Sequence, residues 1–230
     1  MFSRLPKTQI IALIALTILH VVVSWHTIVP GYLLIDEAFY HWMTRDFAST
    51  GSLELWNGYT EFPSPELTHR HVPVHKNRLV AQWPHFFAII ATPLYLMWGL
   101  LGLYVVNVIA FIGVVWLCFL SANKLFEDPK LALNACLLLV LATFAWEYSQ
   151  AIWPHSTALF FIMAAFYFTV CALNAQKRSN RLWLAFGAGL ICGFATGIRM
   201  DTFLASTVVV LPFLFARPWR PVSPCGRSAR

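Results

Sequence analysis

The feature that most constrains this chain is a series of long apolar runs joined by short polar connections. The runs cover residues 8–29, 84–101, 103–122, 131–146, 154–173, 182–198 and 202–216. A helix of about 20 apolar residues spans the hydrocarbon core of a bilayer. With 59% hydrophobic and 11% charged residues, the chain cannot hide this surface in a water-soluble fold. We predict an all-α, polytopic transmembrane helical bundle of about six or seven membrane segments, forming one domain over residues 1–216.

The basic residues predict an orientation. Arg4 and Lys7 precede the first run, so the N-terminus is expected in the cytoplasm. We interpret that run as an uncleaved anchor, with a cleaved signal peptide as the alternative. Residues 217–230 are expected to be a basic cytoplasmic tail or the end of a truncated chain. The net charge of +6 comes from short clusters between apolar runs, which does not indicate a nucleic-acid partner.

Two topologies fit the apolar runs. If every run spans, the connections at residues 123–130 and 174–181 lie outside the cell, against the tendency of basic residues to stay inside. If residues 84–101 instead dip into the membrane or lie along it, every basic connection becomes cytoplasmic. Three acidic sites, at Asp36-Glu37, Glu147 and Asp201, then share the external face. We favour the second topology, in a multi-pass protein of the cell membrane, which is the inner membrane in a bacterium.

A polar segment, about residues 30–83, is predicted to be a long external loop. Within it, residues 36–50 have apolar side chains at helical spacing and end before Gly51, so they predict an amphipathic helix on the membrane surface. The remainder is rich in proline, glycine and charge and is expected to be an ordered or semi-ordered loop. The apolar surroundings of Cys118, Cys136, Cys171 and Cys192 predict buried thiols without disulfides.

Three sites could carry chemistry. Asp36 and Glu37 follow a membrane crossing, where a carboxylate can act as a general base, although acids at a helix start also serve as caps. Glu147 and His155 lie in a turn between two runs, where they could bind a sugar or a phosphate or form an ordinary interfacial turn. Arg199 and Asp201 lie between two apolar runs with almost no loop. Charges there are expensive, and Arg could hold a phosphate, or the two could form a structural pair.

The external loop contains further basic residues. Lys76 and Arg78 precede the run at residue 84 and could attract an anionic lipid head group. The imidazoles of His69, His71 and His75 could bind a metal ion, although a solvated basic loop is the plainer interpretation.

Several stretches resemble GT-C fold membrane glycosyltransferases, with the protein O-mannosyltransferase and aminoarabinose transferase-like branch most similar. They are LIDEAFY at 34–40 with ASTG at 48–51, QWPH at 82–85, TPL at 92–94, LF at 125–126 and GFATGIRMD at 193–201. The resemblance implies transfer of a sugar from a polyprenyl-phosphate donor to a lipid, glycan or protein acceptor on the external face. It implies that Asp36 is the base, that Glu37 supports the site or binds an ion, and that Arg199, with Arg78, faces the lipid phosphate. No cofactor is certain, and a divalent metal ion is left open.

The chain departs from the family pattern in two respects. Family members often have an acid at the position of His155, and they are usually longer, so the chain is a candidate N-terminal portion. The alternatives to an enzyme are a transporter or flippase of a lipid-linked or polar substrate, in which broken helices line a pathway, and a non-catalytic membrane fragment.

Overall fold

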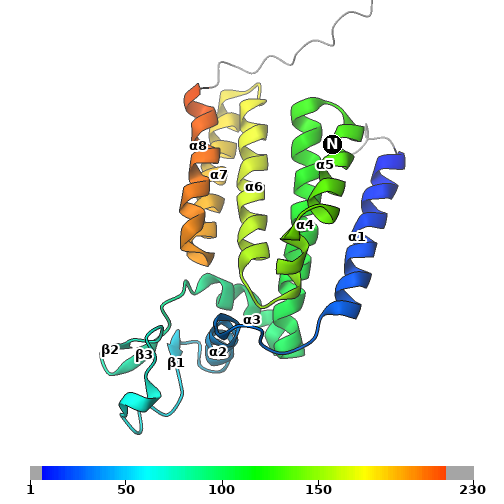
Figure 1. The fold of residues 1–230 in the computed structure, drawn as a ribbon. Helices are drawn as coiled ribbons and strands as arrows, with labels where there is room; N and C mark the ends of the chain where they lie inside the picture. The colour runs from blue at the N-terminus through cyan, green and yellow to red at the C-terminus, as the bar shows by residue number, and fades with distance from the viewer. Residues whose placement is uncertain (1–6, 216–230) are drawn as a thin grey trace, which may run out of the picture.

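The computed structural model describes residues 7–215 as a helical bundle with a polar segment at one end (Figure 1). The bundle consists of α1 (Lys7–Thr27), α4 (Leu100–Phe126), α5 (Pro129–Leu141), the 3₁₀ helix η3 (Phe144–Gln150), α6 (His155–Leu173), α7 (Arg178–Ile198), the 3₁₀ helix η4 (Met200–Ala205) and α8 (Ser206–Phe215). At one end lie α2 (Ile35–Thr50), α3 (Phe86–Trp98), the 3₁₀ helix η2 (Pro65–Leu67) and three short strands. Arg4 and the predicted tail at 217–230 lie outside the described residues.

Four of the described helices, α1, α4, α6 and α7, are long and apolar enough to cross a membrane. The number becomes five if the bent pair α5–η3 forms one span, and α3 and the η4–α8 segment are shorter apolar helices. The predicted multi-pass helical organisation is therefore confirmed in outline, while the predicted number of six or seven segments stays a prediction.

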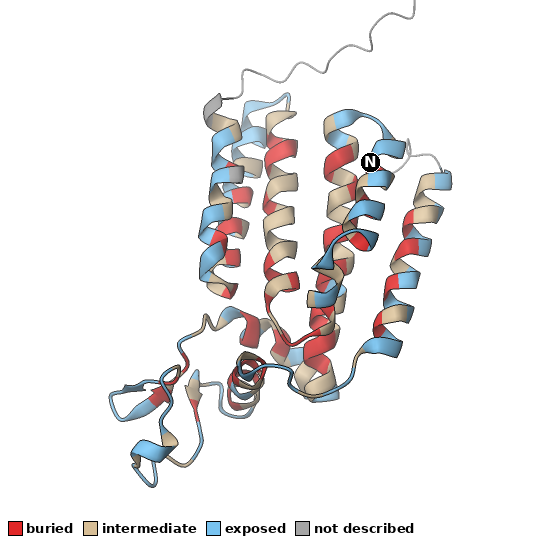
Figure 2. Ribbon diagram, viewed as in Figure 1, coloured by how far each residue is buried: buried red, intermediate tan, exposed pale blue. Residues whose placement is uncertain are grey.

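The burial pattern of the bundle suits an apolar solvent. Phe111, Val114 and Phe119 of α4 are buried, so this helix lies at the core. The outer faces of α1 and α7 expose large apolar side chains such as Trp25 and Trp183 (Figure 2). Contiguous apolar surface of this kind marks contact with lipid or with another protein.

The connections with basic residues lie together. The start of α1, the α4–α5 turn and the α6–α7 turn are all at one end of the bundle, and α2, α3 and the strands are at the other (Figure 1). Lys124 and Lys130 flank the first turn, and Lys177 and Arg178 the second. This separation is the charge distribution expected when residues 84–101 do not cross.

The helix α3 folds back onto α4 instead of crossing the bundle. It contains Pro93 and ends at Gly99, whose φ of 58° is in the left-handed region and reverses the chain. At Gly102 a Cβ would lie 2.2 Å from the carbonyl oxygen of Leu94, so only glycine permits this close return. The sharp turn keeps α3 beside α2, at the same end of the bundle (Figure 1).

Part of the polar segment forms a small antiparallel sheet, which the all-α prediction and the loop predicted for residues 30–83 did not include. The strands β1 (Glu54–Leu55), β2 (Val74–His75) and β3 (Arg78–Val80) are ordered β1-β3-β2. Lys76 and Asn77, both with positive φ, form the tight turn between β2 and β3. The strands are only two or three residues long, too short to show an alternating pattern in the sequence.

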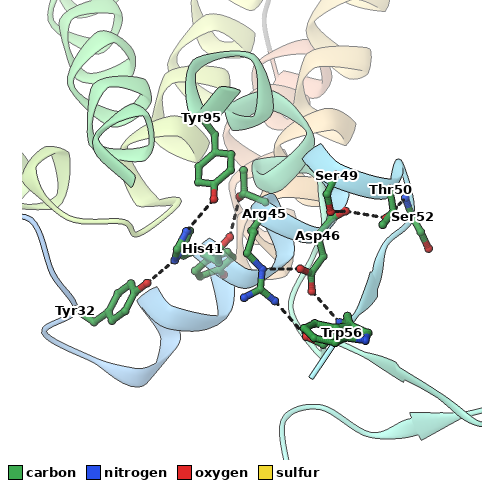
Figure 3. A network of polar contacts seen from close by, with 11 residues as sticks. Tyr32, His41, Arg45, Asp46, Ser49, Thr50, Ser52, Trp56 and Tyr95 are labelled. Atoms are coloured by element: carbon green, nitrogen blue, oxygen red, sulfur yellow. Dashed lines mark hydrogen bonds and ion pairs between the residues drawn. The ribbon is translucent and has the colours of Figure 1, made fainter. Parts of the chain in front are cut away.

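The helix α2 confirms the helix predicted for residues 36–50, while its position on the membrane surface stays a prediction. It ends at Gly51, which has a left-handed φ of 69°, and it buries Phe39 and Met43. Asp46 is also buried, and it fixes the polar segment to the helix (Figure 3). Its Oδ2 accepts a hydrogen bond from the Trp56 N–H at 2.8 Å, and its Oδ1 accepts one from Arg45 Nε at 2.7 Å. Arg45 in turn donates to the Trp56 carbonyl at 3.1 Å.

The apolar run predicted at residues 131–146 is broken. The helix α5 ends at Leu141, and η3 continues at 61° to it. Polar side chains of α1 contact η3: Thr27 Oγ1 donates to Gln150 Oε1 at 2.6 Å, and Ser149 Oγ lies 3.2 Å from His20 Nε2. These contacts fix η3 against α1. Protein contacts are needed here because lipid cannot form hydrogen bonds with the backbone N–H and C=O groups of an irregular segment.

Candidate active site

An open cavity of about 730 Å³ lies where α2, the segment before α3, η3, the start of α6 and the α7–η4 junction meet. Its lining combines two acids, two histidines, four other aromatic residues and one arginine with a glutamine, a proline and a methionine: Asp36, Tyr40, His71, Gln82, Trp83, Pro84, Tyr148, Trp153, His155, Arg199, Met200 and Asp201. Four of the residues predicted from the sequence, Asp36, His155, Arg199 and Asp201, are therefore brought together.

Asp36 contributes an unpaired carboxylate. It lies in the first turn of α2, where the positive end of the helix dipole favours an anion. The predicted capping role does not hold for Asp36, because the N-cap residue is Leu34. Within residues 7–215, the Asp36 side chain has no hydrogen-bond or ion-pair partner, although it is only partly exposed. Its oxygens are therefore free for a ligand in the cavity.

Glu37 has a different position from its neighbour. Its side chain is 1% exposed and does not line the cavity. One carboxylate oxygen accepts hydrogen bonds from the backbone N–H groups of Leu33 and Leu34, at 2.5 and 3.2 Å. The other accepts one from the N–H of Ile152 at 3.1 Å. Glu37 thus joins the start of α2 to the connection before α6 and fixes the position of Asp36.

Arg199 and Asp201 form the opposite charged group. The guanidinium contacts the carboxylate through two bonds, Nε to Oδ1 at 2.9 Å and Nη2 to Oδ2 at 2.6 Å. The remaining nitrogen, Nη1, donates to Nε2 of His155 at 2.7 Å. The hydrogen bond and charge of Arg199 hold the pKa of the Asp201 carboxyl below its usual range. The Asp201 carboxyl is therefore ionised at neutral pH.

Aromatic rings form two walls of the cavity. His155 stacks on Tyr148 with centroids 4.5 Å apart, and Trp153 lies against both rings. On the other side, Trp83 lies beside Phe39 at 4.6 Å and His71 at 5.1 Å. Flat apolar faces with a few polar groups are typical of small-molecule sites.

Tyr40 lies between the two charged groups. Burial raises the pKa of its hydroxyl, Arg199 opposes the rise, and Asp36 and Asp201 add to it. Three charged residues from α2 and the α7–η4 junction thus act on one phenol. This shared influence places them in one electrostatic environment.

A buried polar contact positions the wall that contains Trp153 and His155. Asn107 of α4 donates to the carbonyl of Ala151 at 2.8 Å, and Thr157 of α6 donates to the Asn107 amide oxygen at 2.8 Å. All of the polar atoms involved belong to buried residues. The connection between η3 and α6 is therefore fixed from both the Glu37 side and the α4 side.

Besides Glu37, three predicted site residues are not brought into the cavity. Glu147 is an exposed residue of η3 outside the lining. Lys76 is at the tip of the β2–β3 turn, and Arg78 forms an ion pair with Glu54 of the adjacent strand. The predicted contact of Arg78 with a lipid phosphate has no support in this geometry.

The histidines of the polar segment are not gathered into a set of three or more metal ligands within residues 7–215. His69 and His71 lie side by side, and His71 Nδ1 donates to Gln82 Oε1 at 3.0 Å. In the part of the chain that the structure describes, no group of three or more His, Cys, Asp or Glu side chains could hold a metal ion. The divalent ion left open by the resemblance therefore finds no ready ligand set among these residues.

Several lining residues were not predicted as site residues. They are Tyr40, Gln82, Trp83, Tyr148 and Trp153. The stretches that contain them were considered for other reasons, such as the helical spacing of residues 36–50, the QWPH motif and the turn between two apolar runs. The signal that could have found them is their position, because each lies within a few residues of a predicted charged group or of Pro84. Only the fold shows that these stretches meet.

Comparison with known proteins adds no identification. No protein-family model, no curated protein and no solved structure matches this chain. Its function must therefore be inferred from its residues and geometry.

Proposed function

We propose that this protein is a membrane glycosyltransferase of the GT-C type, which moves a sugar from a polyprenyl-phosphate donor to an acceptor. The observation that supports it best is the cavity shared by the unpaired carboxylate of Asp36 and the guanidinium of Arg199. A base for the acceptor and a cation for the departing phosphate are the two groups that this transfer needs.

The proposed membrane orientation puts the cavity on the external face. The basic turns at the opposite end of the bundle favour a cytoplasmic position for that end and for the N-terminus. In this arrangement α2 and α3 lie along the external membrane surface, and the apolar outer faces of the bundle contact lipid. A polyprenyl chain could then stay in the bilayer while its phosphate enters the cavity.

The reaction is a single displacement of phosphate by an acceptor hydroxyl. The acceptor oxygen forms a bond to the anomeric carbon of the sugar as its proton passes to the Asp36 carboxylate. The bond between that carbon and the phosphate oxygen breaks, and the phosphate keeps the bonding electrons. Arg199 stabilises the negative charge that develops there. The acceptor is a lipid, glycan or protein hydroxyl, and the proton later leaves Asp36 for water.

The remaining residues support these two roles. Glu37 holds Asp36 in place through the backbone N–H of Ile152. Trp153, Tyr148 and His155 offer flat faces on which a sugar ring can lie close to Arg199.

Donor-dependent sugar transfer with the purified protein in lipid vesicles tests the proposal. We expect Asp36→Asn to lower the transfer rate by about 10²–10⁴-fold, the usual contribution of a general base, without changing thermal stability. Glu127→Gln, an exposed acid at the other end of the bundle, is the control and should keep the wild-type rate. Full activity of Asp36→Asn would remove the proposed base.

One observation favours a second function. The bent pair α5–η3 has the form of a broken span or a re-entrant loop, and broken spans line substrate pathways in transporters. Movement of a lipid-linked substrate across vesicles without any bond being broken would support a transporter or flippase instead.

A further inference from the structure

All three nitrogens of the Arg199 guanidinium have a partner. Nε and Nη2 contact the two oxygens of Asp201, and Nη1 contacts His155. The Nε–Nη2 fork, which could bind a phosphate through two parallel bonds, therefore holds a carboxylate. A phosphate that pairs with this fork must first replace the bound carboxylate.

The charges of the cavity make Asp201 a competitor of an incoming phosphate for Arg199. Arg199 is the one arginine or lysine among the described residues that line it. Three other arginines at this end of the bundle are engaged outside the lining or with it: Arg45 pairs with Asp46, Arg78 pairs with Glu54, and Arg70 donates to His71. Asp36 and Asp201 contribute two carboxylates. A phosphate thus has a single guanidinium available, and an internal acid already occupies it.

Asp201 is the more exposed partner of the pair. Its side chain is 59% exposed, compared with 26% for Arg199. Water can solvate the carboxylate if it swings out, at little cost, because exposed ion pairs are weak. Arg199 keeps its contact with His155, which stacks on Tyr148. The guanidinium can therefore stay in place while Asp201 leaves.

We propose that Asp201 is a resident counter-anion. Its carboxylate occupies the phosphate position on Arg199, and the phosphate of a ligand displaces it. The inference rests on the proposed function only for the identity of that ligand, a phosphate linked to an isoprenoid lipid. Asp201 weakens binding of the phosphate and, by returning to Arg199 after transfer, assists its release. Asp201 is in this respect a specificity-determining residue, since only an anion that pairs bidentately with Arg199 can displace it.

Binding of farnesyl phosphate to the full chain in lipid nanodiscs tests this, followed by the fluorescence of the cavity tryptophans or by calorimetry. We expect Asp201→Asn to tighten binding by about three- to tenfold, the range set by a weak, partly exposed ion pair. Arg199→Gln should weaken it at least as much, and the double variant should behave like Arg199→Gln. Farnesol, which has no phosphate, should bind all variants equally, and inorganic phosphate reports the head group alone.

Glu54→Gln is the matched control. It removes one negative charge and releases Arg78, as Asp201→Asn releases Arg199, but it acts outside the cavity lining. Farnesyl phosphate should bind this variant as it binds the wild type. An equal gain in Glu54→Gln would show a general effect of net charge and overturn the proposal.

Other results would overturn it as well. Unchanged or weaker binding by Asp201→Asn would show that Asp201 positions Arg199 instead of competing for it. Asp201→Ser provides a second variant, and loss of folding in both would show that the pair is needed for the fold. If Asp201→Asn binds phosphate more tightly but the protein transfers no sugar, the counter-anion role is supported and the proposed enzyme is refuted. The two failures are therefore distinguishable.

Discussion

The carboxylate of Glu37 accepts a hydrogen bond at 3.1 Å from the backbone N–H of Ile152, 115 residues later in the chain. This contact fixes α2 against the start of α6, and with it the position of Asp36 relative to His155. The sequence suggested that Glu37 shares a catalytic role with Asp36, whereas its burial and its three backbone partners indicate a positioning role.

The first prediction concerns this buried carboxylate. Replacing Glu37 with Ala leaves three backbone N–H groups without their acceptor, so we expect the free energy of unfolding to fall by about 2–4 kcal/mol. Thermal unfolding of the purified protein, followed by intrinsic fluorescence, measures the change. Glu147→Ala removes an exposed acid of η3 and should change stability by only about 0.5 kcal/mol. Equal effects of the two would contradict the positioning role.

The second prediction concerns the side of the membrane on which each end of the bundle lies. Single cysteines at Glu61 and Met200, in a cysteine-free background, should react with an impermeant maleimide from the same side. Cysteines at Glu127 and Lys177, at the other end, should react only after the membrane is opened. If α3 crossed the membrane, Glu127 and Lys177 would instead react together with Glu61, and Met200 would lie on the opposite side. That pattern would separate Arg199 from Asp36 and refute a shared site.

The third prediction concerns the return of α3 onto α4. In Gly102→Ala the new methyl group meets the backbone of Leu94 at 2.2 Å, and backbone cannot move aside cheaply. We expect a loss of about 1–3 kcal/mol in the same unfolding measurement. Gly193→Ala is the control, because nothing lies within 4 Å of its added Cβ. That variant should keep or slightly raise stability, since alanine favours helices.

The fourth prediction concerns pH. His41 of α2 is hydrogen-bonded to the hydroxyls of Tyr32 and Tyr95 (Figure 3). Burial, with the charge of Arg45, lowers its pKa below the ordinary value, and Asp46 opposes part of the shift. The unfolded chain therefore binds the proton more readily than the folded one, so stability is lost as pH falls below about 6.5.

His41→Gln should reduce this acid sensitivity, because the neutral side chain has no proton to take up. The measurement is the unfolding temperature between neutral and mildly acidic pH, compared with the wild type. An unchanged dependence on pH would assign the effect to other groups, such as His85, whose pKa burial also lowers.

The predictable parts of the fold are those with a local signal. The helix over residues 36–50 followed from the spacing of Phe39 and Met43 and from Gly51, all of which act within one element. The strands β1, β2 and β3 could not be predicted, because β1 pairs with the distant β3 and the tight β2–β3 turn uses Lys76 and Asn77 in place of glycine. The break after Leu141 also lacked a signal, since no proline or glycine marks it.

The candidate site shows the same division. The charge of Arg199 and Asp201 among apolar residues, and the position of Asp36 after a crossing, were sufficient to select residues that share the cavity. The sequence could not show that Glu37 faces away from it, or that Glu54 neutralises Arg78. These outcomes depend on contacts between distant segments, which charge and spacing do not specify.

The walls of the cavity also set the order in which it can form during synthesis. Its first carboxylate comes from α2, near the start of the chain, and its guanidinium from the α7–η4 junction, near the end of the described residues. While the ribosome is still translating, Glu37 has no Ile152 to bind and Asp36 faces no Arg199. The early helices can enter the membrane long before the site exists. A nascent chain stopped before the end of α7 would therefore already contain its early membrane helices and still lack the wall that Arg199 and Asp201 form.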